Sequence, residues 1–229
     1  MKEQYLINQQ PGLKSIICLI LDRSGSMGGR ETDVINGVNS FIAEQKKLPD
    51  PASIAFVRFD SEAVETFRVM GPLAYCPPLT ADEYSPRGGT PLFDAVGRTI
   101  SQMDKDWKEQ RADRAIVVIV TDGEENASRE YTKEKIKDMV NARQRTGRWA
   151  FVYLGANVDA FSEASKMGIN PQNVAGYTQT AAGMNAMYSA TSDTVKAMRS
   201  SGETVAHNLG KNIGEAPEET KTATTWTQP

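Results

Sequence analysis

The sequence predicts an α/β fold: a three-layer, doubly wound and mostly parallel sheet with one antiparallel edge strand. Along the 229 residues, apolar runs of strand length alternate with segments whose apolar residues have helical spacing. Two of these runs, residues 16–21 and 115–120, are continuously apolar, which is typical of parallel strands buried on both faces. Strands that alternate with helices predict a Rossmann-like sheet covered by helices on both faces, with right-handed crossovers.

The first half of the chain contains the expected edge strand. Residues 14–21 form the first predicted strand, and the spacing of apolar residues predicts a helix over 31–47. Two further strands are predicted at residues 53–59 and 63–70. Only residues 60–62 separate them, and so short a link permits a hairpin but no parallel crossover. The pair is therefore predicted to be antiparallel, with residues 63–70 at the edge of the sheet.

The second half continues the alternation after a long loop rich in proline and glycine, residues 71–89. A loop of this length in a compact domain often carries function. Helices are predicted around residues 92–103, 136–143, 158–164 and 184–205, and strands at 114–121, 149–154 and 173–177. One folded domain is therefore expected over residues 14–205, with an N-terminal extension at 1–13 and a flexible polar tail at 206–229.

Composition and charge exclude several classes of function. The net charge is −3 and the basic residues are scattered, whereas nucleic-acid binding needs a clustered positive face. The two cysteines are too few for a disulfide framework or a zinc site. Residues 1–12 are polar, and the longest apolar runs have six residues, far fewer than the roughly 20 that span a bilayer. We therefore expect a cytoplasmic protein that binds neither nucleic acid nor membrane.

Five oxygen-bearing side chains are predicted to lie at one edge of the sheet. Asp22, Ser24 and Ser26 follow the first continuously apolar run, and Asp122 follows the second. Thr90 lies in Gly-Gly-Thr-Pro-Leu, at the start of a predicted helix. Ligands of doubly wound sheets bind outside the carboxyl ends of the strands, so these loops are expected to meet over one crevice. Carboxylates and hydroxyls suit a hard divalent cation, Mg²⁺ above all, and the residues do not separate Mg²⁺ from Mn²⁺.

Several of these residues and their neighbours also have plainer interpretations. The two serines could cap a helix after Met27, although capping does not explain the threonine and the second aspartate. Asp94 could orient the metal ligands or could be an ordinary capping residue. The segment 124–126 could form a second cation site, but a solvated acidic turn before a helix is the favoured interpretation. Arg23 and Arg87 could meet a partner's carboxylate or could be ordinary exposed arginines.

The three motifs occur in order along the chain, each at a predicted strand or helix boundary. They are Asp22-x-Ser24-x-Ser26, Thr90 in Gly-Gly-Thr-Pro-Leu, and Asp122 in Val-Thr-Asp-Gly. Together they resemble the metal-ion-dependent adhesion site of von Willebrand factor type A domains, and the resemblance extends over nearly the whole chain.

The resemblance implies a role for each of the five residues. Ser24 and Ser26 would bind the metal through their hydroxyls, whereas Asp22 and Asp122 would act mainly through waters or hydrogen bonds. Thr90 would bind the metal directly or through a water. The resemblance also implies the strand order 3-2-1-4-5-6 and a partner's Asp or Glu carboxylate that completes the coordination shell.

These features predict a non-enzymatic, divalent-cation-dependent protein-binding module that docks a partner's acidic side chain, as an adaptor in an intracellular multiprotein assembly. One alternative is a structural subunit of a larger bacterial or viral complex, which would self-assemble as a homo-oligomer. A metal-assisted hydrolase is a further alternative, because a bound ion can activate water. The single histidine, His207, lies near the end of the chain, so a Ser-His-Asp triad would need the tail to fold back.

Overall fold

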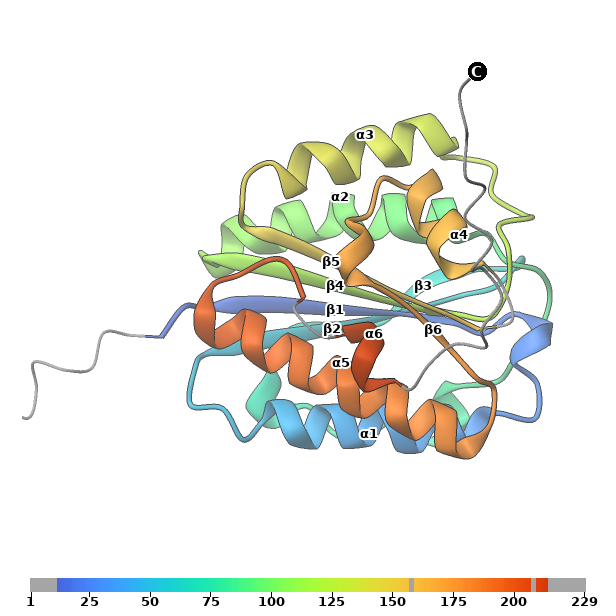
Figure 1. Cartoon of the computed structure of the whole chain (residues 1–229), viewed down its shortest axis with the longest axis horizontal. Coiled ribbons are helices and arrows are strands. Elements are labelled where there is room, and N and C mark those ends of the chain that lie inside the picture. The colour runs from blue at the N-terminus through green and yellow to red at the C-terminus, as the bar shows by residue number, and fades with distance from the viewer. Residues whose placement is uncertain (1–11, 157–158, 207–208, 214–229) are drawn as a thin grey trace, which may run out of the picture.

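The computed structural model describes residues 12–156, 159–206 and 209–213, which contain one six-stranded sheet (Figure 1). The strands follow the spatial order β3-β2-β1-β4-β5-β6. Their bounds are Ser15–Asp22 (β1), Ala52–Phe59 (β2), Val64–Pro72 (β3), Arg114–Thr121 (β4), Trp149–Ala156 (β5) and Val174–Tyr177 (β6). Neighbouring strands are parallel, except that β3 pairs with β2 in the antiparallel sense at one edge. The predicted fold class, strand order and antiparallel edge strand are confirmed.

Helices cover both faces of the sheet and make three layers (Figure 1). Their bounds are Glu31–Gln45 (α1), Leu92–Gln110 (α2), Lys133–Gln144 (α3), Ala160–Lys166 (α4), Ala181–Ser201 (α5) and Leu209–Asn212 (α6). Short 3₁₀ turns lie at Gly25–Met27 (η1), Leu73–Tyr75 (η2), Ala81–Glu83 (η3) and Pro171–Asn173 (η4). The helices α1 and α5 lie side by side on one face, and α2, α3 and α4 cover the other. None of the described helices is long and apolar enough to cross a membrane.

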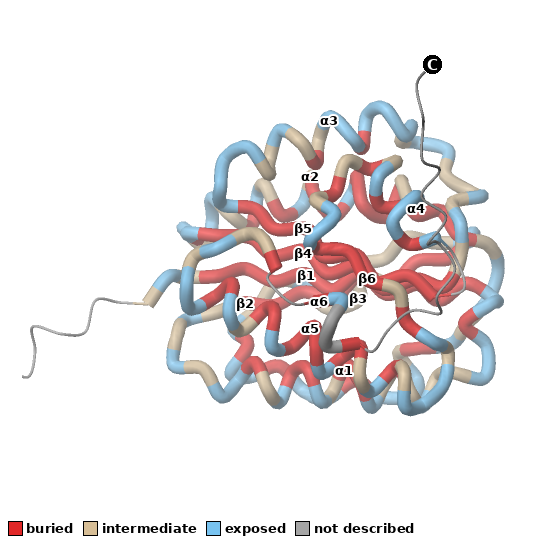
Figure 2. Tube along the Cα trace, viewed as in Figure 1, coloured by how far each residue is buried: buried red, intermediate tan, exposed pale blue. Residues whose placement is uncertain are grey.

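The sheet separates two hydrophobic cores, and this explains why its central strands are apolar at successive positions. Alternate side chains of a strand point to opposite faces. In β1, Ile17 and Leu19 belong to the core shared with α1 and α5, whereas Ile16 and Ile20 belong to the core under α2 and α3. Figure 2 shows the central strands buried and the outer faces of the helices exposed. The continuous apolar runs of the sequence therefore reflect burial on both faces.

Two helices end several residues away from the end that the sequence predicts. The helix that begins at residue 92 extends to Gln110, past the apolar stripe that marks it. The last long helix ends at Ser201 and not at 205, because Gly202 adopts a left-handed φ of 91° and closes it. A stripe of apolar residues locates the buried face of a helix, but the residue that ends the helix is set by its local backbone conformation.

Packed structure continues beyond residue 205, where we expected the domain to end. Ala206, Leu209 and Ile213 are buried against the core that α1 and α5 share. The expected N-terminal extension and C-terminal tail lie largely outside the described residues, as does His207.

The long loop between β3 and α2 is tied to the body of the protein at several points. Arg68 of β3 forms an ion pair with Glu83 and donates a hydrogen bond to the Pro77 carbonyl at 2.6 Å. Asn39 of α1 donates to the Leu79 carbonyl at 3.0 Å and accepts the Leu79 N–H at 2.6 Å. These contacts fix the path of the chain that leads into α2.

Candidate metal centre

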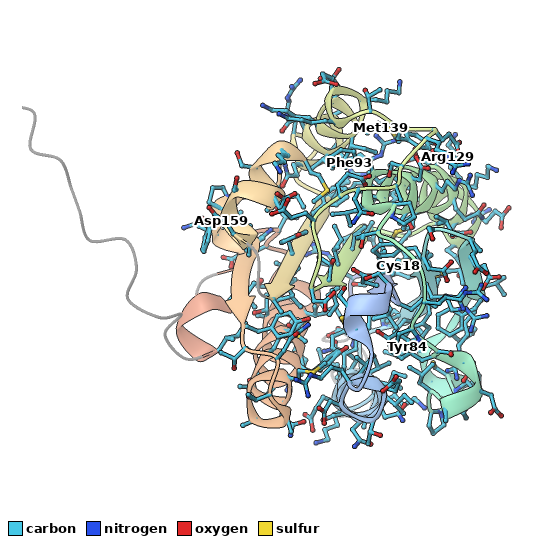
Figure 3. All side chains as sticks on the ribbon, turned by 90° about the vertical axis from the view of Figure 1, so that its right-hand side faces the viewer. Cys18, Tyr84, Phe93, Arg129, Met139 and Asp159 are labelled. Carbon is cyan, nitrogen blue, oxygen red and sulfur yellow. The ribbon has the colours of Figure 1, made fainter. Side chains whose placement is uncertain are left out.

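The loops after β1 and β4 lie at the point where the strand order reverses, because β1 lies between β2 and β4. Figure 3 faces this edge of the molecule. Two backbone hydrogen bonds tie the loop before α2 to the loop after β1. The Gly25 N–H donates to the Gly88 carbonyl at 2.9 Å, and the Arg87 N–H donates to the Arg23 carbonyl at 2.7 Å. Open α/β sheets bind their ligands at this position.

Asp22, the last residue of β1, is fully buried, and protein donors occupy both of its carboxylate oxygens. Oδ1 accepts the Ser24 N–H at 2.7 Å, and Oδ2 accepts the Thr121 hydroxyl at 2.6 Å. The backbone carbonyl of Asp22 accepts the Tyr84 hydroxyl at 2.5 Å, and Tyr84 is visible near η1 in Figure 3. These contacts hold the loop that carries the two serines.

Burial raises the pKa of Asp22 to about 6. Hydrogen bonds from Thr121 and Ser24 act against this rise, and the charge of Asp122 adds to it. The main groups that shift this pKa are hydroxyls, a backbone N–H and a second carboxylate. A cation bound nearby would favour the ionised carboxylate, because it would supply the positive charge that the buried acid lacks.

Asp122 lies at the end of a short chain of hydroxyls. The Ser24 and Ser26 hydroxyl oxygens are 3.0 Å apart, and Ser26 donates to Asp122 Oδ1 at 2.6 Å. The other carboxylate oxygen of Asp122 accepts a hydrogen bond from the side-chain amide of Gln179, which precedes α5. Ser24 and Asp122 are buried, whereas Ser26 is exposed. Oxygens from the loops after β1 and β4 thus form one cluster that solvent reaches at Ser26.

Thr90 joins this cluster from the loop before α2. Its N–H donates to the Asn126 side chain at 2.9 Å, and its carbonyl accepts the Asn126 N–H at 3.1 Å. A methyl group built on Gly123 would lie 3.0 Å from Thr90 Oγ1 and 3.8 Å from Ser26 Oγ, so both hydroxyls lie near the same point. The structure therefore places all five side chains identified in the sequence at one edge of the sheet.

The chemistry of this cluster fits a hard divalent cation. Two carboxylates and three hydroxyls offer oxygen atoms only, which is the ligand type that Mg²⁺ and Mn²⁺ prefer. Within the described ranges, no group of three or more His, Cys, Asp or Glu residues could hold a metal ion. A cation here would therefore depend on the serine and threonine hydroxyls. Gly123 keeps the space open, because a side chain at this position would crowd Thr90.

Comparison with solved structures identifies the fold. Proximal thread matrix protein 1 from the mussel byssus is 15% identical, over 80% of this chain and 46% of that one, with a TM-score of 0.57. A von Willebrand factor type A protein from Catenulispora acidiphila is 16% identical, over 80% of this chain and 42% of that one, with a TM-score of 0.55. The chain has the von Willebrand factor type A fold. The type A domain of SpRpn10 agrees, with 11% identity over 72% of this chain and 86% of that one and a TM-score of 0.50.

The likeness to these type A proteins is one of fold, since the identities are between 11% and 16%. The chain spans less than half the length of the mussel and Catenulispora acidiphila proteins. No family model and no curated protein matches the sequence.

The structure tests the two interpretations that assign helix capping to the serines and to Asp94. The serines do not cap a helix, because η1 has no side-chain cap at Ser24 and α1 begins only at Glu31. Asp94 caps neither α2 nor α3, whose N-cap residues are Pro91 and Thr132. Its carboxylate accepts three backbone N–H groups of the loop before α3, those of residues 129–131, at distances of 2.8 to 2.9 Å. Asp94 therefore holds the segment that follows the loop after β4.

The segment 124–126 has a structural role for two of its three residues. Glu125 accepts the Phe93 N–H at 2.9 Å and the Ala127 N–H at 2.9 Å, which joins this segment to the first turn of α2. Asn126 holds Thr90 through the two hydrogen bonds described above. Glu124 is exposed. The side chains of Glu125 and Asn126 are therefore occupied by hydrogen bonds within the protein, as expected for a structured turn.

The two arginines differ from each other in exposure. Arg23 is 4% exposed, and its guanidinium lies 2.5 Å from Asp60 and 3.3 Å from Glu65. The interpretation of Arg23 as an exposed arginine is therefore wrong, because strands β2 and β3 bring two carboxylates to it. Arg87 forms ion pairs with Asp60 and Glu62 at 3.1 Å, and its side chain is 45% exposed. Of the two, Arg87 is the one that reaches the surface.

Sequence reasoning missed the residues that hold the cluster from outside the three motifs. Tyr84 and Gln179 contact Asp22 and Asp122 from positions far away along the chain. No local pattern identifies them, because their roles depend on how two loops pack. Thr121 belongs to the motif around Asp122, but its hydroxyl donates a hydrogen bond to one oxygen of Asp22, which the motif does not predict. A hydroxyl at the end of a buried strand, next to a buried carboxylate, is the signal that could have shown this.

Proposed function

We propose that this protein is a non-enzymatic, divalent-cation-dependent protein-binding module that docks an acidic side chain of a partner. The observation that carries this proposal is the convergence of oxygen-bearing side chains from three loops on one point at the reversal of strand order. Ser24, Ser26 and Thr90 would hold Mg²⁺ or Mn²⁺ through their hydroxyls, and Asp22 and Asp122 would act through hydrogen bonds or waters. The type A fold and its position for ligands support this arrangement.

The balance of charge explains why such a site would bind a carboxylate. Mg²⁺ prefers about six oxygen ligands at roughly 2.0–2.1 Å and gives up its waters reluctantly. Neutral hydroxyl ligands leave the positive charge of an ion only partly compensated, and both oxygens of Asp22 already accept hydrogen bonds. The bound ion would supply a Lewis-acidic position at the protein surface. An Asp or Glu side chain of a partner provides the anionic oxygen that this position favours, and Ser26 marks the exposed side.

The proposal is tested with Mn²⁺ and a blocked glutamate. Bound Mn²⁺ that keeps exchangeable waters enhances the relaxation of water protons, and a carboxylate that displaces a water lowers this enhancement. We expect N-acetyl-glutamate amide to lower it saturably, whereas N-acetyl-glutamine amide, of the same shape without charge, leaves it unchanged. Equal effects of the two compounds would contradict carboxylate docking.

The same preparation separates an adaptor from a self-assembling subunit. Sedimentation of the protein with Mg²⁺ and with EDTA measures whether the cation changes its mass in solution. An adaptor keeps the same mass in both conditions, and a subunit that assembles through its own acidic side chains becomes smaller in EDTA.

A further inference from the structure

A cavity of about 340 Å³ lies between the second half of α2 and the edge of the sheet formed by β2 and β3. It is separate from the oxygen cluster, which α2 approaches only at its first residues. Its apolar lining includes Cys18 of β1, Ala55 and Val57 of β2, Met70 of β3 and Met103 of α2. The volume is at the small end of the range of about 300–1,000 Å³ that ligand sites occupy.

One wall of the cavity carries a carboxylate that has no cationic partner. Asp106 of α2 is 8% exposed and lines the cavity. Its Oδ1 accepts a hydrogen bond from the Gln102 amide at 3.0 Å, and no Lys or Arg of the described chain forms an ion pair with it. Burying a charge is costly unless the charge is paired. A cation at this wall would remove that cost.

A second polar group of the cavity also has no partner. The Thr99 hydroxyl belongs to a residue that is 3% exposed, and among the described residues it has no hydrogen-bond partner. Thr99 lies seven positions before Asp106 on α2, two turns of the helix, so both side chains are on the same face. Two turns separate the two positions by about 10 Å along the helix axis, so one polar head group of a ligand can contact only one of them.

The floor of the cavity is uncharged. Cys18 is fully buried, and burial, with a contribution from the charge of Asp106, raises the pKa of its thiol. The thiol therefore stays protonated and packs as a small apolar group. The mouth carries Glu109, which is exposed, so a negative charge also lies at the entrance. Val69 of the edge strand, 78% exposed, adds apolar surface beside it.

We propose that this cavity binds a protonated primary alkylamine, with the ammonium at Asp106 and the carbon chain against Cys18, Met70 and Met103. An ammonium carries three donors, which suit the free acceptor capacity of the Asp106 carboxylate. Its aliphatic chain removes apolar surface from water in the inner part of the cavity. A free alkylamine and the side chain of a lysine on a partner present this same chemistry.

The test follows the methionine methyl groups by NMR in protein labelled with ¹³C at these methyls, in the presence of EDTA. Omitting divalent cations makes the result independent of the proposed metal centre. We expect n-butylammonium chloride to shift the Met70 and Met103 signals saturably. Met184 and Met187 lie in the core on the other face of the sheet and serve as internal references whose signals stay in place. The absence of a saturable shift at Met70 and Met103 overturns the proposal.

The role of charge is tested with two variants and a neutral ligand. Asp106→Asn is expected to weaken binding of n-butylammonium at least tenfold, about one unit in the logarithm of the dissociation constant. Asp104→Asn is the matched control on the same helix, because Asp104 pairs with Arg143 and does not line the cavity. On the unmodified protein, n-butanol has the same chain without the charge and is also expected to bind at least about tenfold more weakly. Equal binding of the amine and the alcohol contradicts the proposal without any variant.

A final comparison separates the two sources of the amine. Saturable shifts with N-acetyl-lysine methylamide as well as n-butylammonium support the proposal and assign the cavity to a partner's lysine. Shifts with n-butylammonium alone support it and assign the cavity to a free amine, because the backbone of the blocked lysine then does not fit the mouth.

Discussion

Asp122→Ala is expected to weaken uptake of Mn²⁺ or Mg²⁺ at least tenfold, about 1.4 kcal/mol or more, while the protein stays folded. Asp122 supplies one of the two carboxylates of the cluster, and its Oδ1 holds the exposed Ser26 hydroxyl at 2.6 Å. The substitution therefore removes negative charge and frees the Ser26 hydroxyl that would bind the ion. Thr90→Ala is expected to act in the same direction, because it removes the single oxygen that the loop before α2 contributes. Isothermal titration calorimetry measures both effects.

Glu124→Ala is the matched control for this experiment. Glu124 is an exposed acid in the same loop as Asp122. Its substitution by alanine changes the net charge of the protein by the same amount as Asp122→Ala. If Glu124→Ala weakened metal uptake as much as Asp122→Ala, a general negative potential and not a defined site would attract the cation. Folding of Asp122→Ala is checked by urea unfolding, where a small change is expected because Asp122 lies in a loop beyond the end of β4.

Asp94→Ala is expected to lower the free energy of unfolding by about 3 kcal/mol. The Asp94 carboxylate is 6% exposed and accepts three backbone N–H groups, those of residues 129–131. Each hydrogen bond to a charged group contributes about 1.5–3 kcal/mol to stability. In the variant, water can hydrogen-bond to some of the freed N–H groups. The loss of all three hydrogen bonds is therefore expected to cost about as much as one or two of them. Urea unfolding measures the change as a shift in the midpoint at unchanged slope.

Asp104→Ala shows what an ordinary acid of the same helix contributes. Its side chain is 42% exposed and pairs with Arg143, and an exposed pair of this kind contributes less than about 1 kcal/mol. Asp94→Asn keeps one oxygen acceptor and is expected to lie between wild type and Asp94→Ala. Equal unfolding midpoints for Asp94→Ala and Asp104→Ala would show that the three N–H groups find other acceptors and that the Asp94 hydrogen bonds are not important for stability.

Much of the fold could be predicted from the sequence, because burial on two faces leaves a local signature. The apolar runs at 16–21 and 115–120 have no polar interruption, and the structure places them in adjacent strands at the centre of the sheet. The three residues between β2 and β3 excluded a parallel crossover, and these strands pair antiparallel. Both inferences use neighbours along the chain, which is where sequence patterns are informative.

The contacts that were missed join residues that are far apart along the chain. The sequence leaves Arg23 either to meet a partner's carboxylate or to be an ordinary exposed arginine. In the structure, Asp60 and Glu65 approach it from the neighbouring strands and it is buried. Gln179 reaches Asp122 only because β6 and β4 end at the same edge of the sheet. The sequence located the motifs at strand and helix boundaries, whereas packing determined which other side chains hold them.

A titration of Mn²⁺ followed by electron paramagnetic resonance tests the central claim most directly, because free hexaaqua Mn²⁺ gives a sharp signal that is lost on binding. The account predicts that the free signal stays low until one ion per chain has been added, that Mg²⁺ releases the bound ion, and that Asp122→Ala restores the free signal. A free signal that rises in proportion to added Mn²⁺ from the first addition, with wild type and Asp122→Ala alike, would contradict it.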